Sequence, residues 1–355
     1  MEIRADYGFT LEVCDPRSGN ILHQDSLGSL VKLGEHALFE ALCRGQVPPR
    51  AYETMKYAHA APVWSSEKKR PYVAGIALTV EADQVQAPFT KTYRLTSFQN
   101  MARRIGSLLI EQGILDNNSQ IAYRVSAFPR EGKTKAEQSK RGLRLTSKVT
   151  SGRRSPVEAR PEEVFGNVSP LSGELFDVYV MKPVTDAIIQ HTRTAHQYER
   201  ASFLTGYLGF SPDSRRVYLA VTGEVPARGA ESTCTSFSFS CETFVEAQAH
   251  ITQQPNPQQS YVVGWEHNHT YCLECSDCSH CSTTTAFWSV DDDQVQASAF
   301  TEPYQVALVI GIKNQDPPAG NQPLYDFKLY GWRDAAMCER KFWIVNKGKT
   351  YDTNK

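Results

Sequence analysis

Apolar residues in the first part of this chain follow two kinds of spacing, one typical of strands and one typical of helices. Short runs rich in apolar and β-branched residues predict strands at 72–80 and 121–127. Between them, apolar residues at helical spacing predict a helix from Ser97 to Gly113. Ser97 has the side chain of an N-cap, and Gly113 suits the position just beyond a helix end. We therefore expect an N-terminal α+β region.

The second part of the chain alternates between the two kinds of pattern more densely. Apolar runs predict strands at 175–180, 203–208, 216–221, 235–239, 261–265, 306–312 and 326–332. Helical spacing predicts helices at 185–198, 241–253 and 290–300. Strands and helices are mixed here without strict strand-helix-strand repetition, which again predicts the α+β class.

A basic segment separates the two regions. Residues 130–160 contain ten basic and three acidic residues, and the segment has almost no apolar periodicity. We expect an exposed linker at 130–160 that joins an N-terminal domain, 1–129, to a C-terminal domain, 161–355. Because the segment lacks aromatic residues for base stacking, we do not expect nucleic acid as its partner.

Composition excludes several classes of protein. The 355 residues are 41% hydrophobic and 22% charged with net charge −1, which excludes a globally basic nucleic-acid binder. No apolar run approaches the roughly 18 residues of a membrane-spanning helix. The first residues lack the basic and then apolar pattern of a signal peptide. We expect a cytoplasmic chain whose nine cysteines are thiols or metal ligands and not disulfides.

Two histidines follow the apolar run at 261–265. Side chains alternate along a strand, so His267 and His269 are expected on one face while Glu266 and Asn268 point away. Two imidazoles on one face make half of a zinc site, although a histidine pair on a solvated strand end gives the same pattern.

Carboxylates complete the candidate chemistry. Ser289 and Asp292 have the spacing of a capping box at the start of the helix predicted at 290–300, and a carboxylate held there can also bind a metal. A catalytic zinc also needs a base beside its water, and Glu199, at a junction between a predicted helix and strand, is the candidate. Spacing alone leaves other acids open: Glu224, Glu231 and Glu266.

Three motifs in order carry a resemblance to a known family: Glu199-x-x-x-x-Leu-x-Gly, Gly264-Trp265-x-His267-x-His269 and Ser289-x-x-Asp292. Over about residues 165–335, the chain resembles the JAMM (JAB/MPN) zinc isopeptidases, which cleave ubiquitin and ubiquitin-like proteins from lysines. The resemblance implies a mixed sheet flanked by helices. It implies His267, His269 and Asp292 as zinc ligands, Glu199 as general base and acid, and Ser289 as oxyanion support.

The sequence departs from the family pattern after the second histidine. The family usually has proline where this chain has Thr270, and segment 270–288 is about ten residues longer than usual. The insert carries four regularly spaced cysteines: Cys272, Cys275, Cys278 and Cys281. A structural zinc bound by four thiolates is one interpretation, and an iron–sulfur cluster or a redox-labile disulfide are the others.

The resemblance implies a ubiquitin-like protein or its conjugate as substrate, and activating and conjugating enzymes as pathway partners. An extra N-terminal domain and a Cys-rich insert are more similar to prokaryotic members, some of which are linked to antiphage defence. Three alternatives stay open: a peptidase of the same fold that trims a precursor, a scaffold without catalysis, and a nucleic-acid-associated protein that uses 130–160. The five filled catalytic positions argue against a scaffold.

Overall fold

The fold is described from a computed structural model of the chain. The residues that it describes are 2–27, 30–55, 57–67, 71–80, 88–116, 118–129, 153–166, 168–194, 199–227, 231–232, 237–253, 260–269, 286–313, 324–346 and 349–352. The chain divides into two units. The first comprises Met1–Leu42, Gln46–Ser155 and Asp334–Ala336, and the second comprises Cys43–Gly45, Pro156–Arg333 and Met337–Lys355.

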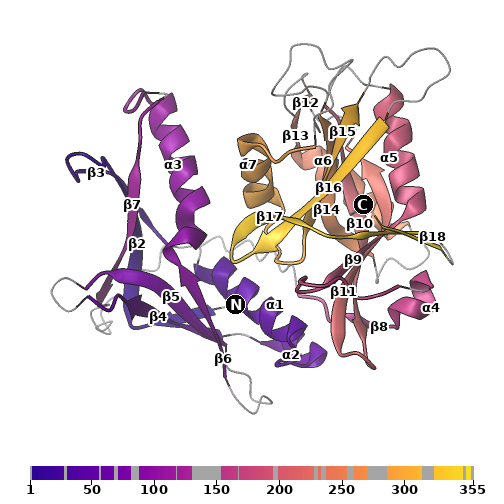
Figure 1. Cartoon of the computed structure of the whole chain (residues 1–355), viewed down its shortest axis with the longest axis horizontal. Coiled ribbons are helices and arrows are strands. Elements are labelled where there is room, and N and C mark those ends of the chain that lie inside the picture. Colours follow the sequence, from indigo (N-terminus) through magenta and orange to yellow (C-terminus); the bar gives the residue numbers. More distant parts are fainter. Residues whose placement is uncertain are drawn as a thin grey trace, which may run out of the picture. The chain divides into compact units, whose positions relative to one another are not determined.

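The first unit combines two small sheets with helices. Its elements are β1 (Glu2–Ala5), β2 (Tyr7–Cys14), β3 (Ile21–Ser26), α1 (Leu30–Cys43), α2 (Pro49–Thr54), β4 (Tyr57–Trp64), β5 (Val73–Val80), β6 (Phe89–Arg94), the 3-10 helix η1 (Leu95–Phe98), α3 (Gln99–Glu111) and β7 (Ala122–Pro129). One sheet has the order β1-β4-β5-β6 and the other β3-β2-β7. Figure 1 labels β4, β5 and β6 of the first sheet and all the strands of the second.

Buried apolar positions of α1 recur at helical spacing, including Leu33, Ala37, Leu38 and Ala41. Burying this stripe stabilises the helix through packing more than through its own propensity. The described end of the basic segment belongs to this unit, where the guanidinium of Arg153 lies 2.8 Å from the Glu35 carboxylate. Residues 130–152 of that segment lie outside the described residues.

The second unit holds the candidate chemistry. Its elements are β8 (Val157–Glu158), α4 (Pro161–Phe165), β9 (Asp177–Met181), α5 (Lys182–Thr194), β10 (Ala201–Ser211), β11 (Arg216–Pro226), β12 (Glu231–Ser232), β13 (Phe237–Ser238), α6 (Cys241–Thr252), β14 (Tyr261–His269), α7 (Val290–Ala299), β15 (Val306–Lys313), β16 (Leu324–Arg333), β17 (Ala336–Arg340), β18 (Trp343–Asn346) and β19 (Lys349–Asp352).

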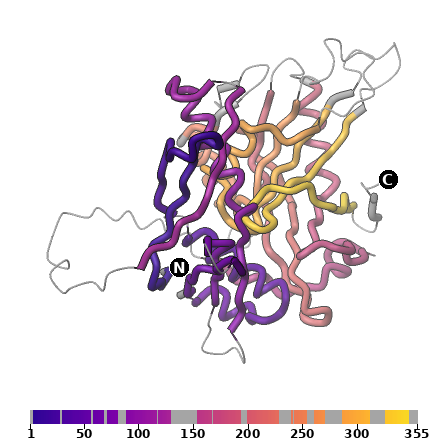
Figure 2. Tube along the Cα trace, turned by 60° about the vertical axis from the view of Figure 1, so that its left-hand side comes forward, coloured from indigo at the N-terminus to yellow at the C-terminus, as the bar shows by residue number. Residues whose placement is uncertain are grey.

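One large mixed sheet organises this unit. Its described strands follow the order β17-β16-β15-β14-β10-β11-β9-β18-β19, and β8 pairs with β10. Strand β14 lies inside the sheet, antiparallel to β10 and parallel to β15. The strands can be followed side by side in Figure 2. Because β14 has hydrogen-bonded neighbours on both edges, its side chains are held in a fixed register.

Helices cover both faces of this sheet. In Figure 1, α5 and α7 lie on opposite sides of it. On the α7 side, α6 contributes Ala247, and strands β10 and β14 contribute Phe203 and Trp265, to one buried apolar cluster that also contains Phe300. The described elements therefore confirm the α+β class for the chain.

Most predicted elements are present with shifted ends. Strand β14 continues four residues beyond the predicted Trp265, and β11 continues to Pro226 instead of Val221. The prediction that Ser97 caps a helix is wrong: η1 intervenes, α3 begins at Gln99, and its N-cap is Phe98, which makes no side-chain cap bond. Gly113, with φ of 70°, does lie in the left-handed conformation that suits a helix end. Residues 235–236 of the predicted strand 235–239 lie outside the described residues.

Among the described residues, every helix falls short of the length and apolar character that crossing a membrane requires.

Candidate metal centre

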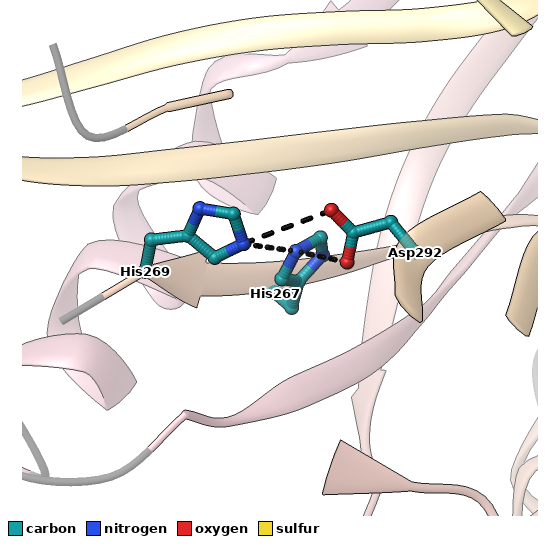
Figure 3. Close-up of side chains that lie close together, drawn as sticks. All are labelled: His267, His269 and Asp292. Carbon is teal, nitrogen blue, oxygen red and sulfur yellow. Dashed lines mark hydrogen bonds and ion pairs between the residues drawn. The ribbon is translucent and has the colours of Figure 1, made fainter. Parts of the chain in front are cut away.

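Three ligand-type side chains converge between β14 and α7. His267 and His269 project from the end of β14, and Asp292 projects from the first turn of α7. Their ligand atoms all lie within 4.8 Å of one another, and all three residues are buried. Figure 3 shows the two imidazoles and the carboxylate turned toward a common point. This buried group could bind a metal ion.

The distances within the group agree with a metal site. His267 Nε2 lies 2.9 Å from His269 Nε2 and 2.9 Å from Asp292 Oδ1, and His269 Nε2 lies 3.7 Å from Asp292 Oδ2. Ligand atoms about 2.0 to 2.1 Å from a tetrahedral zinc are about 3.3 Å apart, so small side-chain adjustments suffice to fit the ion. Two imidazole nitrogens and a carboxylate oxygen also form a donor set that zinc accepts.

A capping box fixes the carboxylate. The Ser289 hydroxyl accepts a hydrogen bond from the Asp292 N–H at 3.0 Å, and Asp292 Oδ2 accepts one from the Ser289 N–H at 2.8 Å. The same residues therefore begin the helix and orient the carboxylate, whose Oδ1 is the oxygen nearer His267. A hydroxyl that accepts at its oxygen still has its own proton to donate.

Glu199 precedes β10 and is 3% exposed. Its Oε1 is buried and has no hydrogen-bond partner among the described residues, an arrangement that leaves it available to a water or substrate proton. Burial raises the pKa of Glu199 to about 7; the His267 charge opposes this, while the charges of Asp292 and Asp291 add to it. The pKa of Glu199 therefore depends on the charges of two candidate metal ligands, His267 and Asp292.

Two of the three alternative acids, Glu224 and Glu266, are placed elsewhere, while the side chain of Glu231 lies outside the described part of the chain. Glu266 alternates with His267 along β14, and its pKa is raised to about 8 by burial, although a hydrogen bond with Ser202 lowers it. Glu224 is hydrogen-bonded to the same serine and lies 3.5 Å from His191 Nδ1 on α5. Both carboxyls therefore belong to the α5 face of the sheet, away from the two histidine side chains.

Electrostatics favours a charged carboxylate in the metal ligand group. Burial alone raises the pKa of Asp292, but the charges of the two histidines and the hydrogen bonds from His267 and the Ser289 backbone outweigh it and bring the pKa down to about 2. An ionised carboxylate is the form that binds a metal cation.

Aromatic rings hold the imidazoles in place. The ring of Trp265 stacks on His267 with centroids 4.6 Å apart, and Phe287 packs on His269 at 4.4 Å. Close strand approach supports this arrangement: a Cβ at Gly264 would lie only 2.0 Å from the Val306 carbonyl oxygen, so only glycine lets β14 pair with β15 there.

The predicted cysteine site falls in a segment that the structure does not describe. Thr270 and the four cysteines lie outside the described residues: Cys272, Cys275, Cys278 and Cys281.

Sequence reasoning assigned no role to two amide side chains near the candidate metal ligands. Asn268, between the histidines, is hydrogen-bonded to the backbone of Arg200, and Gln296 is hydrogen-bonded to the indole of Trp265. Neither belongs to a spacing pattern that predicts chemistry. The only signal in the sequence was their position: Asn268 follows the candidate ligand His267, and Gln296 lies one helical turn after Asp292.

Comparisons with known proteins add little to this picture. The sequence matches no family model, and no curated protein matches it. Among solved structures, the chain is similar to the solution structure of protein DSY2949 from Desulfitobacterium hafniense, with 19% identity and a TM-score of 0.33. That match covers 48% of this chain and 94% of the other. The fold and the site themselves define an α+β protein with a candidate metal centre.

Proposed function

We propose that this chain is a zinc-dependent isopeptidase of the JAMM type. One observation carries the proposal: the ligand atoms of the buried His267, His269 and Asp292 lie within 4.8 Å of one another. The charges of His267 and Asp292 also influence the pKa of the buried carboxyl of Glu199. The mixed sheet with helices on both faces also supports the JAMM/MPN architecture that the sequence motifs imply.

Zinc is the metal that best fits the ligand set. Two histidines and one carboxylate are three protein ligands, which is the number in catalytic zinc sites, whereas structural sites usually have four. When bound, zinc supplies a Lewis acid that brings the pKa of water near 7 and polarises a carbonyl. His267, His269 and Asp292 would hold it.

Glu199 moves the proton in this mechanism. Its carboxylate accepts a proton as water oxygen bonds to the carbonyl carbon of the isopeptide. It then delivers that proton to the lysine nitrogen as the carbon–nitrogen bond breaks, so the products are a carboxylic acid and an amine. A carboxyl whose pKa lies near 7 both accepts and returns a proton near neutral pH.

Ser289 stabilises the developing negative charge. Its oxygen caps α7, and its O–H donates to the carbonyl oxygen as charge builds up there. Losing one such donor costs about 2.7 to 4 kcal/mol in other enzymes.

The substrate we propose is a ubiquitin-like protein joined to a lysine, or its precursor. Activating and conjugating enzymes of the same pathway are then the partners, in the cytoplasm of a prokaryote, with antiphage defence as one setting. This part of the proposal rests on the motifs around Glu199, His267 and Ser289.

The test uses the full chain loaded with zinc and a panel of ubiquitin-like proteins linked to lysine by an isopeptide bond. We expect cleavage by the wild type and none above background by Glu199→Gln, which keeps its size but cannot accept the proton. Zinc content should be equal in both proteins. Equal cleavage by the two proteins would assign the base to another acid, and conjugate binding without cleavage by the wild type would favour the scaffold.

A further inference from the structure

Gln296 joins α7 to β14 one helical turn beyond the candidate ligand Asp292. Its amide oxygen accepts a hydrogen bond from the Trp265 indole N–H at 2.7 Å, and its amide nitrogen donates to the Phe300 carbonyl at 2.8 Å. The Gln296 side chain is completely buried, as is the indole. Both halves of the amide are therefore used, which fixes its orientation.

The indole held by Gln296 is the ring that packs on the ligand His267. The two rings are nearly parallel, at 16°, with centroids 4.6 Å apart, and Phe300 stacks on the same indole at 5.7 Å. An imidazole packed against a ring that cannot turn has a restricted orientation, so its Nε2 stays directed at Asp292.

Two connections thus join the same strand and helix. His267 and Asp292 make the first at 2.9 Å, and Trp265 and Gln296 make the second. On β14 the two residues are two positions apart and share a face, and on α7 they are four apart and share a face. The second connection fixes the separation of the first without involving a ligand atom.

We propose that Gln296 is a positioning residue that sets the metal affinity of the His267–His269–Asp292 group. It holds Trp265, and through it the imidazole of His267, in an orientation that directs Nε2 toward Asp292. The proposal rests on the metal-binding part of the proposed function and not on isopeptide cleavage. Partners that orient metal ligands typically change affinity 10- to 100-fold when they are removed.

A purely structural role predicts a different result. If Gln296 only satisfied a buried indole, its replacement would lower the stability of the metal-free protein and leave the affinity of the folded protein unchanged. Metal affinity and metal-free stability must therefore be measured separately.

The experiment compares Gln296→Met with Gln294→Met in the full chain. Gln294 lies on the exposed side of the same helix, so the control makes the same chemical change without touching the indole. Zinc is removed with a chelator and returned in competition with a chromophoric chelator. A His267→Ala protein run in parallel defines the binding that belongs to this group, so that zinc held elsewhere is subtracted.

We expect Gln296→Met to weaken His267-dependent zinc binding 10- to 100-fold and to shift the visible absorption bands of the Co²⁺-loaded protein, with no change for Gln294→Met. Trp265→Phe keeps an aromatic ring and removes the donor. It should weaken binding similarly, and the double variant should lose little more. Trp265→Phe decides the question if Gln296→Met does not fold.

Unchanged zinc affinity and Co²⁺ bands in both variants would overturn the proposal, as would absence of His267-dependent binding in the wild type. The outcome is independent of turnover. If the variants show the expected loss of zinc affinity but the wild type cleaves no conjugate, the proposed isopeptidase activity is refuted and this inference still holds. If the wild type cleaves conjugates but Gln296→Met has unchanged zinc affinity, the isopeptidase activity stands and this inference is refuted.

Discussion

The side-chain oxygen of Asn268 accepts a hydrogen bond from the backbone N–H of Arg200 at 2.8 Å, and the Asn268 N–H donates to the Arg200 carbonyl at 3.2 Å. Asn268 separates the two candidate histidine ligands, and Arg200 follows Glu199. The pair therefore extends the pairing of β10 with β14 by one position and fixes the backbone beside the proposed base relative to the metal ligands.

This relationship predicts the effect of Asn268→Leu. Leucine has a similar volume but no acceptor, so the segment carrying Glu199 loses the hydrogen bond from the Arg200 N–H to the Asn268 side chain. A reacting group misplaced by about 1 Å can cost on the order of 10²-fold in rate. We expect kcat to fall about 10- to 100-fold with KM and zinc content little changed, as measured by steady-state cleavage and metal analysis.

Asn268→Asp is the matched control because it keeps an acceptor oxygen in the same place. It should retain more of the activity than the leucine variant. Full kcat in Asn268→Leu, or loss of zinc together with activity, would show that Asn268 does not act by positioning Glu199.

Ser289 combines two roles that substitutions can separate. Alanine removes both the helix cap and the hydroxyl, whereas glycine is a tolerable N-cap that removes only the hydroxyl. Ser289→Ala should lower the free energy of unfolding by about 1 kcal/mol, and Ser289→Gly by a few tenths. Both should lower kcat by roughly 10²- to 10³-fold, as expected for a lost oxyanion donor.

Urea unfolding and steady-state kinetics on the two Ser289 variants provide the test. Wild-type kcat in Ser289→Gly would show that the Ser289 hydroxyl does not stabilise the oxyanion and that the residue only caps the helix.

Hydrophobic patterning predicted much of the second unit and little of the first. The apolar run before His267 ends at Trp265, and only the alternation of the two histidines with Glu266 and Asn268 indicated that the strand continues to His269. Pairing with β15 on one side extends the strand, since Asn268 and His269 lie opposite Ile310 and Gly311. At the start of α3, Phe98 is buried, and a 3-10 turn lies where a serine cap was expected.

The candidate site shows the same division. Ser289 and Asp292 stand out because a capping box is a local pattern of four residues, and the histidines because strand alternation brings them together. Gln296 and Asn268 act across the sheet and helix, on partners 31 and 68 residues away. Local spacing carries no information about such partners, so only the tertiary structure identifies them.

The first unit contains a histidine, His36, whose protonation should make the free energy of unfolding depend on pH. Burial, assisted by the charge of Lys32, lowers the pKa of His36 from its ordinary value of 6.5 to about 4. The fold favours the neutral imidazole, so this contribution is complete above pH 6.5 and is lost as the pH falls toward 4. Within that window it changes by up to about 1.4 kcal/mol per pH unit.

Urea unfolding of the full chain at pH 7 and pH 4.5 checks this for wild type and His36→Gln. The glutamine variant should lose less stability between the two values. An equal loss in both proteins would mean that His36 does not titrate with unfolding.

Metal content per chain tests the central claim most directly. The protein is purified without added zinc, as wild type and as His267→Ala/His269→Ala, and metal is quantified by mass spectrometry. We predict that the wild type holds one equivalent of zinc that the double variant lacks, while any zinc bound by the four cysteines appears equally in both. Equal metal content in the two proteins would contradict the assignment of His267, His269 and Asp292 as a metal centre.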